Sequence, residues 1–534
     1  MPAIAYVSDE NYVALPDVSA EFEAVESISK HVLRSSPRGA FYGDVPPGRY
    51  RVTLSRQGYG SKWVECDLGS ADPYQFRLLS RRLAGFMWPK WVQTGDSSEI
   101  RVHSPEEYQL SLWRYGINKE FVRLVSWFDE HGPSATEQIT PDGDYSQTGV
   151  NWNHHGYPSS HVQQFITAPE QSGLYYLWAR TRSGETFSFP WVVAPARPRA
   201  NIAVLASTNT WNAYNNFGGR SNYINPGGLP STPTVNARLD LSRYTTPASL
   251  WSIPDGSFKP LTFERPEFGN DIFDSSPWTT SSPADPIQGR MQCGQAPGEW
   301  RLLAWLEREG FDYDYYADAQ LHDGTLSLEA YRILIISVHP EYWTRQMFDR
   351  VDQWVRQTGG RLLYLGGNGL NCEVTLEPDA TMHCVSHDDT KGPSSPHESR
   401  MHRTHRPEAT LLGVAFTDPG AMTSAPYRVL DPDHWVFNGT GLRKGDLFGQ
   451  KSLHERVPGG ASGHETDKVT PSSPRQVQRL AKGTNPDEGG ADLIYLKLGQ
   501  GAVFSVGSIT WVSSLFPDAN VSRVTRNVIE RFLE

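Results

Sequence analysis

The sequence predicts a protein of several domains, in which two β-sandwich domains precede an α/β domain built on a mainly parallel sheet. Three observations support this fold class. The chain has 534 residues, which allows several domains at roughly 150 residues each. Up to about residue 197, short runs with alternating apolar residues are separated by Gly/Pro turns, as in antiparallel sheets. Beyond residue 201, apolar strands alternate with amphipathic helices, as in parallel βαβ units.

We expect the domains to cover residues 1–90, 91–197 and 198–534. In the first, RYRVTLSR and SKWVECDL have the period of two that is typical of strands. The second is expected to be an immunoglobulin-like sandwich, with the strands YQLSLWRYG, FVRLVSWF, GLYYLWARTRSG and TFSFPWVV. The Pro-rich stretch APARPRA, residues 194–200, indicates a linker at its end.

The α/β domain is expected to begin with the strand IAVLAS, followed by a long loop rich in Gly, Asn, Ser and Pro. The segment APGEWRLLAWLEREG is predicted to be a helix, because Trp300, Leu303, Ala304 and Leu306 recur near helical spacing. The later expected elements are the strand YRILIISV, the helix TRQMFDRVDQWVRQTGG, the strand RLLYLGG, a polar tract over residues 376–408, the strand AVFSVGSI and the terminal helix VSRVTRNVIERFL.

The composition excludes several classes of protein. The net charge is −11, and no block of basic residues offers a face for phosphates, so neither nucleic acid nor an anionic membrane is an expected partner. The chain shows no apolar run of membrane-spanning length and no secretory signal pattern, so we expect a cytoplasmic protein. The cysteines are too few and too irregularly spaced for a disulfide framework or a CxxC metal site, so we expect reduced thiols. They are Cys66, Cys293, Cys372 and Cys384.

Two loops that follow predicted parallel strands carry side chains able to form a site, because open α/β sheets bind ligands at the carboxyl ends of their strands. The loop over residues 205–225 carries Tyr214 and Tyr223 among amides and glycines, although aromatic packing and Asn turns also explain this composition. The segment HPEYW places Glu341 between an apolar strand and a helix, where a carboxylate also suits the helix dipole.

A third loop, GGNG, follows RLLYL at the turn where enzymes with a nucleophile elbow carry their serine or cysteine. Asn368 occupies that position, and no G-x-S-x-G sequence occurs in the chain. Covalent catalysis at this turn is therefore unsupported. A nearby histidine-rich tract is interpreted as a solvated polar loop, since its spacing fits no zinc motif. Its histidines are His383, His387, His397, His402 and His405.

Five short motifs occur in order between about residue 198 and the end of the chain: TWNAYNNFGGRSNY, HPEYW, GGRLLYLGGNG, ASGHETD and GAVFSVGSITW. Together they resemble the large-subunit catalytic region of the N,N-dimethylformamidase family. The resemblance implies an α/β domain similar to class I glutamine amidotransferases without their cysteine nucleophile, in agreement with an asparagine at the elbow. It also implies one iron ion held by two tyrosines and a glutamate.

Matched by motif, the iron ligands are Glu341 of HPEY, Tyr214 of WNAYNN and Tyr223 of GGRSNY. Two phenolates and a carboxylate are hard oxygen donors, which suit Fe³⁺ better than a thiophilic metal. The family's other pocket residues are matched by His339, Asn368 and Glu465 of ASGHETD.

The leading hypothesis is an iron-dependent amidohydrolase that cleaves a non-peptide C–N bond of a small amide. In it, His339 and Asn368 donate hydrogen bonds to the developing oxyanion, and Glu465 accepts a proton from water and passes it to the leaving amine. One alternative is a catalytically inactive carbohydrate-binding or scaffolding protein with aromatic-rich β domains. Another is a cysteine-dependent enzyme using Cys372, whose thiol would have to stand at the elbow. We also expect a homo-oligomer, with contacts through the β domains.

Overall fold

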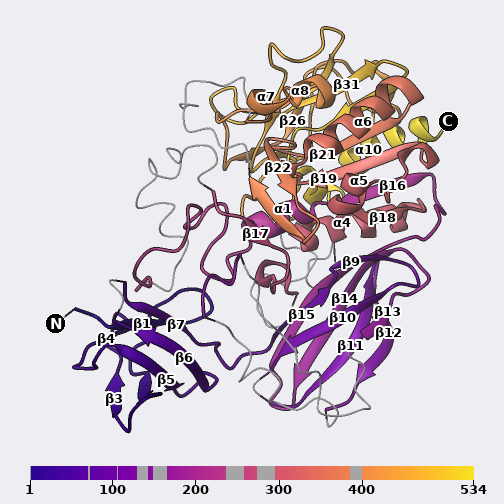
Figure 1. Cartoon of the computed structure of the whole chain (residues 1–534). Helices are drawn as coiled ribbons and strands as arrows, with labels where there is room; N and C mark the ends of the chain where they lie inside the picture. The colour runs from indigo at the N-terminus through magenta and orange to yellow at the C-terminus, as the bar shows by residue number, and fades with distance from the viewer. Residues whose placement is uncertain are drawn as a thin grey trace.

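The structure is a computed structural model that describes residues 2–69, 72–104, 106–128, 142–147, 165–235, 258–272, 285, 295–384 and 400–534. Its described elements form three sheet-bearing parts, which follow one another along the chain (Figure 1). The strands and helices expected from the sequence are present, and the differences are described below. The boundaries of the three expected domains stay a prediction.

The strands of the N-terminal part are β1 Ala5–Ser8, β2 Ser19–Ala24, β3 Lys30–Arg34, β4 Ala40–Phe41, β5 Gly48–Ser55, β6 Lys62–Leu68 and β7 Tyr74–Arg77. They form a sheet in the order β4-β1-β7 and another in the order β3-β2-β5-β6. The alternation in β5 buries Tyr50, Val52 and Leu54. These side chains pack with Val7 and Phe76 of the other sheet in one core.

The strands of the second part are β8 Ala84–Trp88, β9 Trp91–Gln93, β10 Ser97–His103, β11 Tyr108–Tyr115, β12 Lys119–Ser126, β13 Phe165–Thr167, β14 Gly173–Thr181 and β15 Thr186–Ala194. A five-stranded sheet, β12-β11-β14-β15-β9, faces a three-stranded sheet, β13-β10-β8. Leu110, Leu177 and Phe189 of the larger sheet pack with Phe86 and Ile100 of the smaller one. This core between two sheets agrees with the expected sandwich.

The third part is built on a nine-stranded sheet in the order β18-β16-β19-β21-β32-β31-β30-β26-β27. Its strands are β16 Ile202–Ala206, β18 Asp314–Ala317, β19 Ile333–Val338, β21 Arg361–Gly366, β26 Tyr427–Val429, β27 Leu447–Phe448, β30 Gln478–Gly483, β31 Asp492–Leu498 and β32 Gly501–Ser505. The pairings from β18 to β32 are parallel and those from β32 to β27 are antiparallel. The expectation of a mainly parallel sheet is therefore wrong for one half. The tight turn at Gly499, where φ is +61°, reverses the chain and makes β31 and β32 an antiparallel pair.

Helices cover both faces of this sheet (Figure 1). Val204 and Ile335 pack with α4 and α10 on one face, whereas Leu205 and Leu334 pack with α6 on the other. The helices are α1 Thr208–Tyr214, α4 Gln295–Glu309, α5 Asp318–Asp323, α6 Arg345–Thr358, α7 Arg400–Thr404, α8 Ala409–Leu412, α9 Trp511–Ser514 and α10 Ala519–Leu533. The layers agree with an α/β domain, while the likeness to glutamine amidotransferases stays a prediction.

Small sheets lie beside the carboxyl ends of the parallel strands. One has the order β17-β23-β22-β20, with β17 Leu261–Thr262, β20 Tyr342–Trp343, β22 Cys372–Leu376 and β23 Thr381–Cys384. Two further pairs are β24 Ala415–Phe416 with β29 Asp467–Lys468, and β25 Ser424–Ala425 with β28 Ser462–Gly463. The two pairs fix the chain on either side of residue 465.

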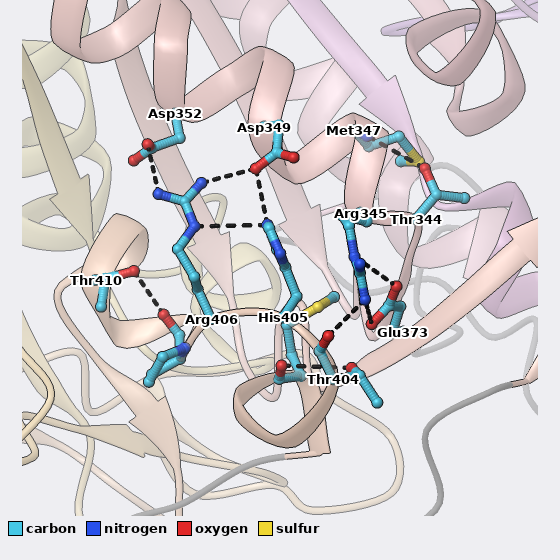
Figure 2. A network of polar contacts seen from close by, with 12 residues as sticks. Thr344, Arg345, Met347, Asp349, Asp352, Glu373, Thr404, His405, Arg406 and Thr410 are labelled. Atoms are coloured by element: carbon cyan, nitrogen blue, oxygen red, sulfur yellow. Dashed lines mark hydrogen bonds and ion pairs between the residues drawn. The ribbon is translucent and has the colours of Figure 1, made fainter.

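The polar tract over residues 376–408 is not a loop throughout, because it includes β23 and α7. Figure 2 shows how the chain after α7 is attached to α6: the side chains of His405 and Arg406 contact Asp349 at 2.7 and 2.8 Å. His405 therefore serves in packing, and the described residues contain no group of three His, Cys, Asp or Glu side chains arranged for a metal ion. His387 and His397 lie outside the described residues.

Two further expectations can be compared with the structure. In the described part of the chain, no helix combines the length and the apolar composition that crossing a bilayer requires. Cys66 is a buried free thiol, as expected, and Cys372 and Cys384 are buried as well. Cys293 lies outside the described residues.

Candidate metal centre and active site

The first candidate loop begins with a short helix that the sequence did not predict. Helix α1 ends at Tyr214, although Thr and Asn are poor helix formers. Glu299 of α4 holds it, because its Oε1 accepts hydrogen bonds from the backbone N–H of Ser207 and from the indole N–H of Trp211, both at 3.1 Å. Tertiary contacts therefore override the weak helix propensity and fix the position of Tyr214.

Two fully buried arginines, Arg220 and Arg265, hold the segment that follows α1. Arg265 donates to the backbone carbonyls of Asn212 and Phe217, at 2.9 and 2.7 Å. Arg220 pairs with Asp144 at 3.0 Å. The sequence analysis did not single out these arginines; the available signal was a charged residue inside the motif GGRSNY. They act by satisfying carbonyl groups that the irregular loop would otherwise bury unpaired.

The same segment rests on the N-terminal part of the molecule. The Gly218 N–H donates to the carbonyl of Glu10 at 2.8 Å. Arg77, which is fully buried, donates to the carbonyl of Gly218 at 3.2 Å. A Cβ atom at Gly219 would lie 2.4 Å from the Cβ of Tyr12. The loop that carries the two tyrosines is therefore shaped partly by residues far away in the sequence.

Glu341 lies just beyond the carboxyl end of β19. This strand ends at Val338, whose φ of +60° is strained for a β-branched residue. The turn places the Glu341 N–H 3.1 Å from Oγ1 of Thr210 in α1, to which it donates. Glu341 is buried, and Thr344, not Glu341, caps α6 by accepting from the Met347 N–H. Thr344 thus satisfies the helix N-terminus, and the Glu341 carboxylate is available to the tyrosines.

The hydroxyl groups of Tyr214 and Tyr223 both reach the carboxylate of Glu341. Tyr214 donates to Oε2 at 2.9 Å, and the Tyr223 hydroxyl lies 2.9 Å from Oε2 and 3.1 Å from Oε1. The two hydroxyl oxygens are 2.9 Å apart. Tyr342, which the sequence analysis did not single out although it adjoins Glu341, donates to the Tyr223 hydroxyl at 2.9 Å. The structure therefore gathers the three side chains matched to iron ligands.

The chemistry of this donor set fits a hard cation. Burial raises the pKa of Tyr214 well above its usual value, and Glu341 and Tyr223 raise it further. A phenolate at this position therefore needs a cation close by. Two phenol oxygens and a carboxylate, separated by 2.9–3.1 Å, are the kind of ligands that trivalent iron prefers. Close to them, Oδ1 of Asn368 is buried with no hydrogen-bond partner in the described part of the chain.

His339 and Glu465 form an ion pair beside the tyrosines. Nε2 of His339 lies 3.0 Å from Oε2 of Glu465 and 3.4 Å from Oε2 of Glu341. Burial alone would raise the pKa of Glu465, but the charge and hydrogen bond of His339 outweigh it and lower this pKa to about 2. Burial alone would lower the pKa of His339, but Glu465 outweighs it and raises this pKa. The proton of the pair therefore resides on His339, and Glu465 is a carboxylate at neutral pH.

The loop around Glu465 presses against the turn after β21. A Cβ atom at Gly367 would lie 2.4 Å from the carbonyl oxygen of Glu465. The next residue, Asn368, has a φ of +52°, and its N–H donates to Oδ1 of Asp467 at 2.8 Å. Its Nδ2 lies 3.5 Å from Nε2 of His339. This close packing brings all three matched pocket residues to one place.

Cys372 does not stand where a nucleophile would. The left-handed position of the turn is held by Asn368, and Cys372 comes four residues later, at the start of β22. Its thiol is buried, with Sγ 3.7 Å from Oε1 of Glu341. The elbow position therefore carries an amide and not the thiol that the cysteine-dependent alternative requires.

Comparison with known proteins finds relatives for most of the chain. Residues 113–522 match the family described as "N,N-dimethylformamidase beta subunit-like, C-terminal". The N,N-dimethylformamidase beta subunit of Paracoccus aminophilus is 26% identical, over 78% of this chain and 62% of the relative. That of an Alcaligenes species is 25% identical, over 80% of this chain and 63% of the relative. The chain thus spans less than two thirds of the length of these curated relatives.

A solved thua-like protein from Bacteroides uniformis covers 44% of this chain and 82% of its own at 12% identity, with a TM-score of 0.28, which is too low to show a shared fold. The family match is the stronger finding. It covers more than half of the chain, and all six matched site residues fall within it. The chain therefore belongs to the N,N-dimethylformamidase beta subunit-like family.

Proposed function

We propose that the protein is a hydrolase of non-peptide C–N bonds, which cleaves a small amide with the help of one iron ion bound by Tyr214, Tyr223 and Glu341. The observation that carries the proposal is the convergence of two phenol groups on one buried carboxylate, at 2.9–3.1 Å. The two relatives described above, which are named as amidase subunits, support the same chemistry.

Ferric iron at this place would supply Lewis acidity toward an amide carbonyl and toward water. The chain's own residues have three tasks. His339 and Asn368 offer N–H groups near the Glu341 carboxylate, where they can stabilise negative charge on the carbonyl oxygen. Glu465 accepts a proton from water and returns it to the departing amine. Because His339 holds the proton of the pair, Glu465 is present as the carboxylate that this role requires.

Iron content and amide hydrolysis, measured on protein purified without added metal, test the proposal. We expect about one iron per chain, a visible phenolate-to-iron band and release of dimethylamine from N,N-dimethylformamide. Tyr223→Phe should lose iron and turnover. Tyr342→Phe is the matched control, because the Tyr342 hydroxyl donates to Tyr223 and is not one of the three matched iron ligands, so this variant should retain iron.

Two results would refute parts of this proposal. Colourless protein with stoichiometric zinc would overturn the ferric assignment. Full activity in protein without metal would overturn the mechanism.

The relatives are named as beta subunits, which also supports the expected assembly into an oligomer. Light scattering on the purified chain would test this assembly. A homo-oligomer and a cytoplasmic location stay predictions.

A further inference from the structure

The outer face of the five-stranded sheet has a depression of about 440 Å³. At one end of this face, Tyr115 and Tyr176 are covered by Trp300 of α4, with the Tyr115 and Trp300 rings 4.6 Å apart. The depression lies beside this covered end, on strands β11, β14 and β15. Its lining residues are Gln109, Ser111, Trp113, Trp178, Arg180, Gly184 and Thr186. Its volume lies within the range of roughly 300–1,000 Å³ that is typical of small-ligand pockets.

Two indole rings form the apolar wall of this depression. The rings of Trp113 and Trp178 are 5.8 Å apart and inclined at 75°. The indole N–H of Trp113 donates to Oγ of Ser111 at 2.9 Å, and its ring meets Phe121 edge to face at 5.3 Å. These contacts fix the orientation of Trp113 before any ligand binds. Because the indoles stand nearly perpendicular, they form a corner and cannot hold a flat heterocycle between parallel faces.

Polar side chains with unused hydrogen-bonding capacity complete the lining. Gln109, Arg180 and Thr186 form neither hydrogen bonds nor ion pairs with their side chains in the part of the chain that the structure describes. They are neighbours across the sheet, since Gln109 lies opposite Arg180 and Arg180 lies opposite Thr186. One row of the sheet thus presents an amide, a guanidinium and a hydroxyl beside the indoles.

We propose that this depression is a saccharide-binding site, and that its ligand includes a sugar ring that bears a carboxylate. The C–H groups on one face of a pyranose pack on the electron-rich face of an indole. The hydroxyl groups of the sugar bond to Gln109 and Thr186. Arg180, a cation without a counter-ion among the described residues, binds the carboxylate. The site shares no residue with the candidate metal centre, so it goes beyond the proposed amidase function and does not depend on it.

Native gel electrophoresis of the full chain, in gels cast with polygalacturonate or with neutral hydroxyethyl cellulose, tests this proposal. We expect retardation by polygalacturonate. The net charge of −11 opposes unspecific attraction to a polyanion, so retardation reports a local site. Trp178→Ala and Arg180→Ala should each weaken binding about tenfold. Trp63→Ala is the matched control, because this indole is 61% exposed on a different sheet and should bind as the original chain does.

Arg180 is exposed, so Arg180→Ala remains informative even if Trp178→Ala fails to fold, which circular dichroism would reveal. Retardation by neither polymer, or equal retardation of Trp178→Ala, Arg180→Ala and the original chain, overturns the proposal. Stronger retardation by the neutral polymer, lost in Trp178→Ala, overturns the carboxylate assignment and supports the saccharide site.

Discussion

Gly367→Ala is predicted to damage the candidate active site, although none of the six matched residues is replaced. An added Cβ would lie 2.4 Å from the carbonyl oxygen of Glu465 and 2.9 Å from the backbone nitrogen of Ile509. Ordinary contact begins at 3.4 Å, so the loop around Glu465 must retreat by about 1 Å, and both obstacles are backbone atoms that cannot rotate away. Overpacking of this kind costs about 1–3 kcal/mol of folding free energy. A misplacement of about 1 Å at a reacting group lowers turnover by roughly 10²-fold.

The measurements are urea unfolding, iron content and release of dimethylamine from N,N-dimethylformamide. We expect a lower unfolding midpoint, retained iron and much slower turnover. Gly359→Ala is the control: its Cβ would meet nothing closer than 3.7 Å, and its φ of +82° alone should lower stability by about 1 kcal/mol. That variant should keep its turnover. Unchanged stability and turnover in Gly367→Ala would refute the inferred contact between the two loops.

Three further predictions concern single side chains. Glu465→Gln keeps the size of the side chain but cannot accept a proton, so turnover should fall roughly 10²–10⁴-fold while iron is retained; joint loss of iron and activity would instead make Glu465 a ligand. Cys372→Ser should leave turnover nearly intact, and a loss above about a thousandfold, with fold and iron retained, would revive the cysteine hypothesis. Burial raises the pKa of Asp271 from 3.8 to about 7, outweighing the two hydrogen bonds that its Oδ1 accepts from Ser188. The folded state therefore keeps a proton that the unfolded chain releases, and stability falls as pH rises from about 4 to about 7. Asp271→Asn should lose less stability over this pH range than the original chain, which a comparison of urea unfolding midpoints at about pH 5 and about pH 8 would measure. The same decrease in midpoint for the variant and the original chain would contradict this role of Asp271.

Much of the site's location could be predicted, because it follows from local patterns. An apolar strand followed by HPEYW placed Glu341 at a strand end, and the GGNG turn placed Asn368 at the elbow. Only the family resemblance indicated which of these side chains bind the metal, since no spacing rule describes a site of two tyrosines and a glutamate.

The features that could not be predicted depend on contacts between distant segments. Helix α1 was missed because its residues have weak helix propensity and Glu299 stabilises it from another helix. Glu465 has the local sequence of an exposed loop, yet its side chain is only 22% exposed, because Gly367 allows its loop to approach. The antiparallel half of the large sheet was missed because β26 has only three residues and β30 is partly polar.

The hydrogen bond between Arg77 and Gly218 joins positions 141 residues apart, and this separation bears on how the protein is made. A ribosome adding roughly 5–20 residues per second needs about 7–28 s to synthesise that stretch. The N-terminal strands therefore emerge well before the loop that later rests on them, and they have time to fold into the surface that receives it. A circular permutant that begins at residue 198 would reverse this order. The tyrosine loop would then leave the ribosome before its support, and the yield of active protein after synthesis should fall even if the finished chain reaches the same structure.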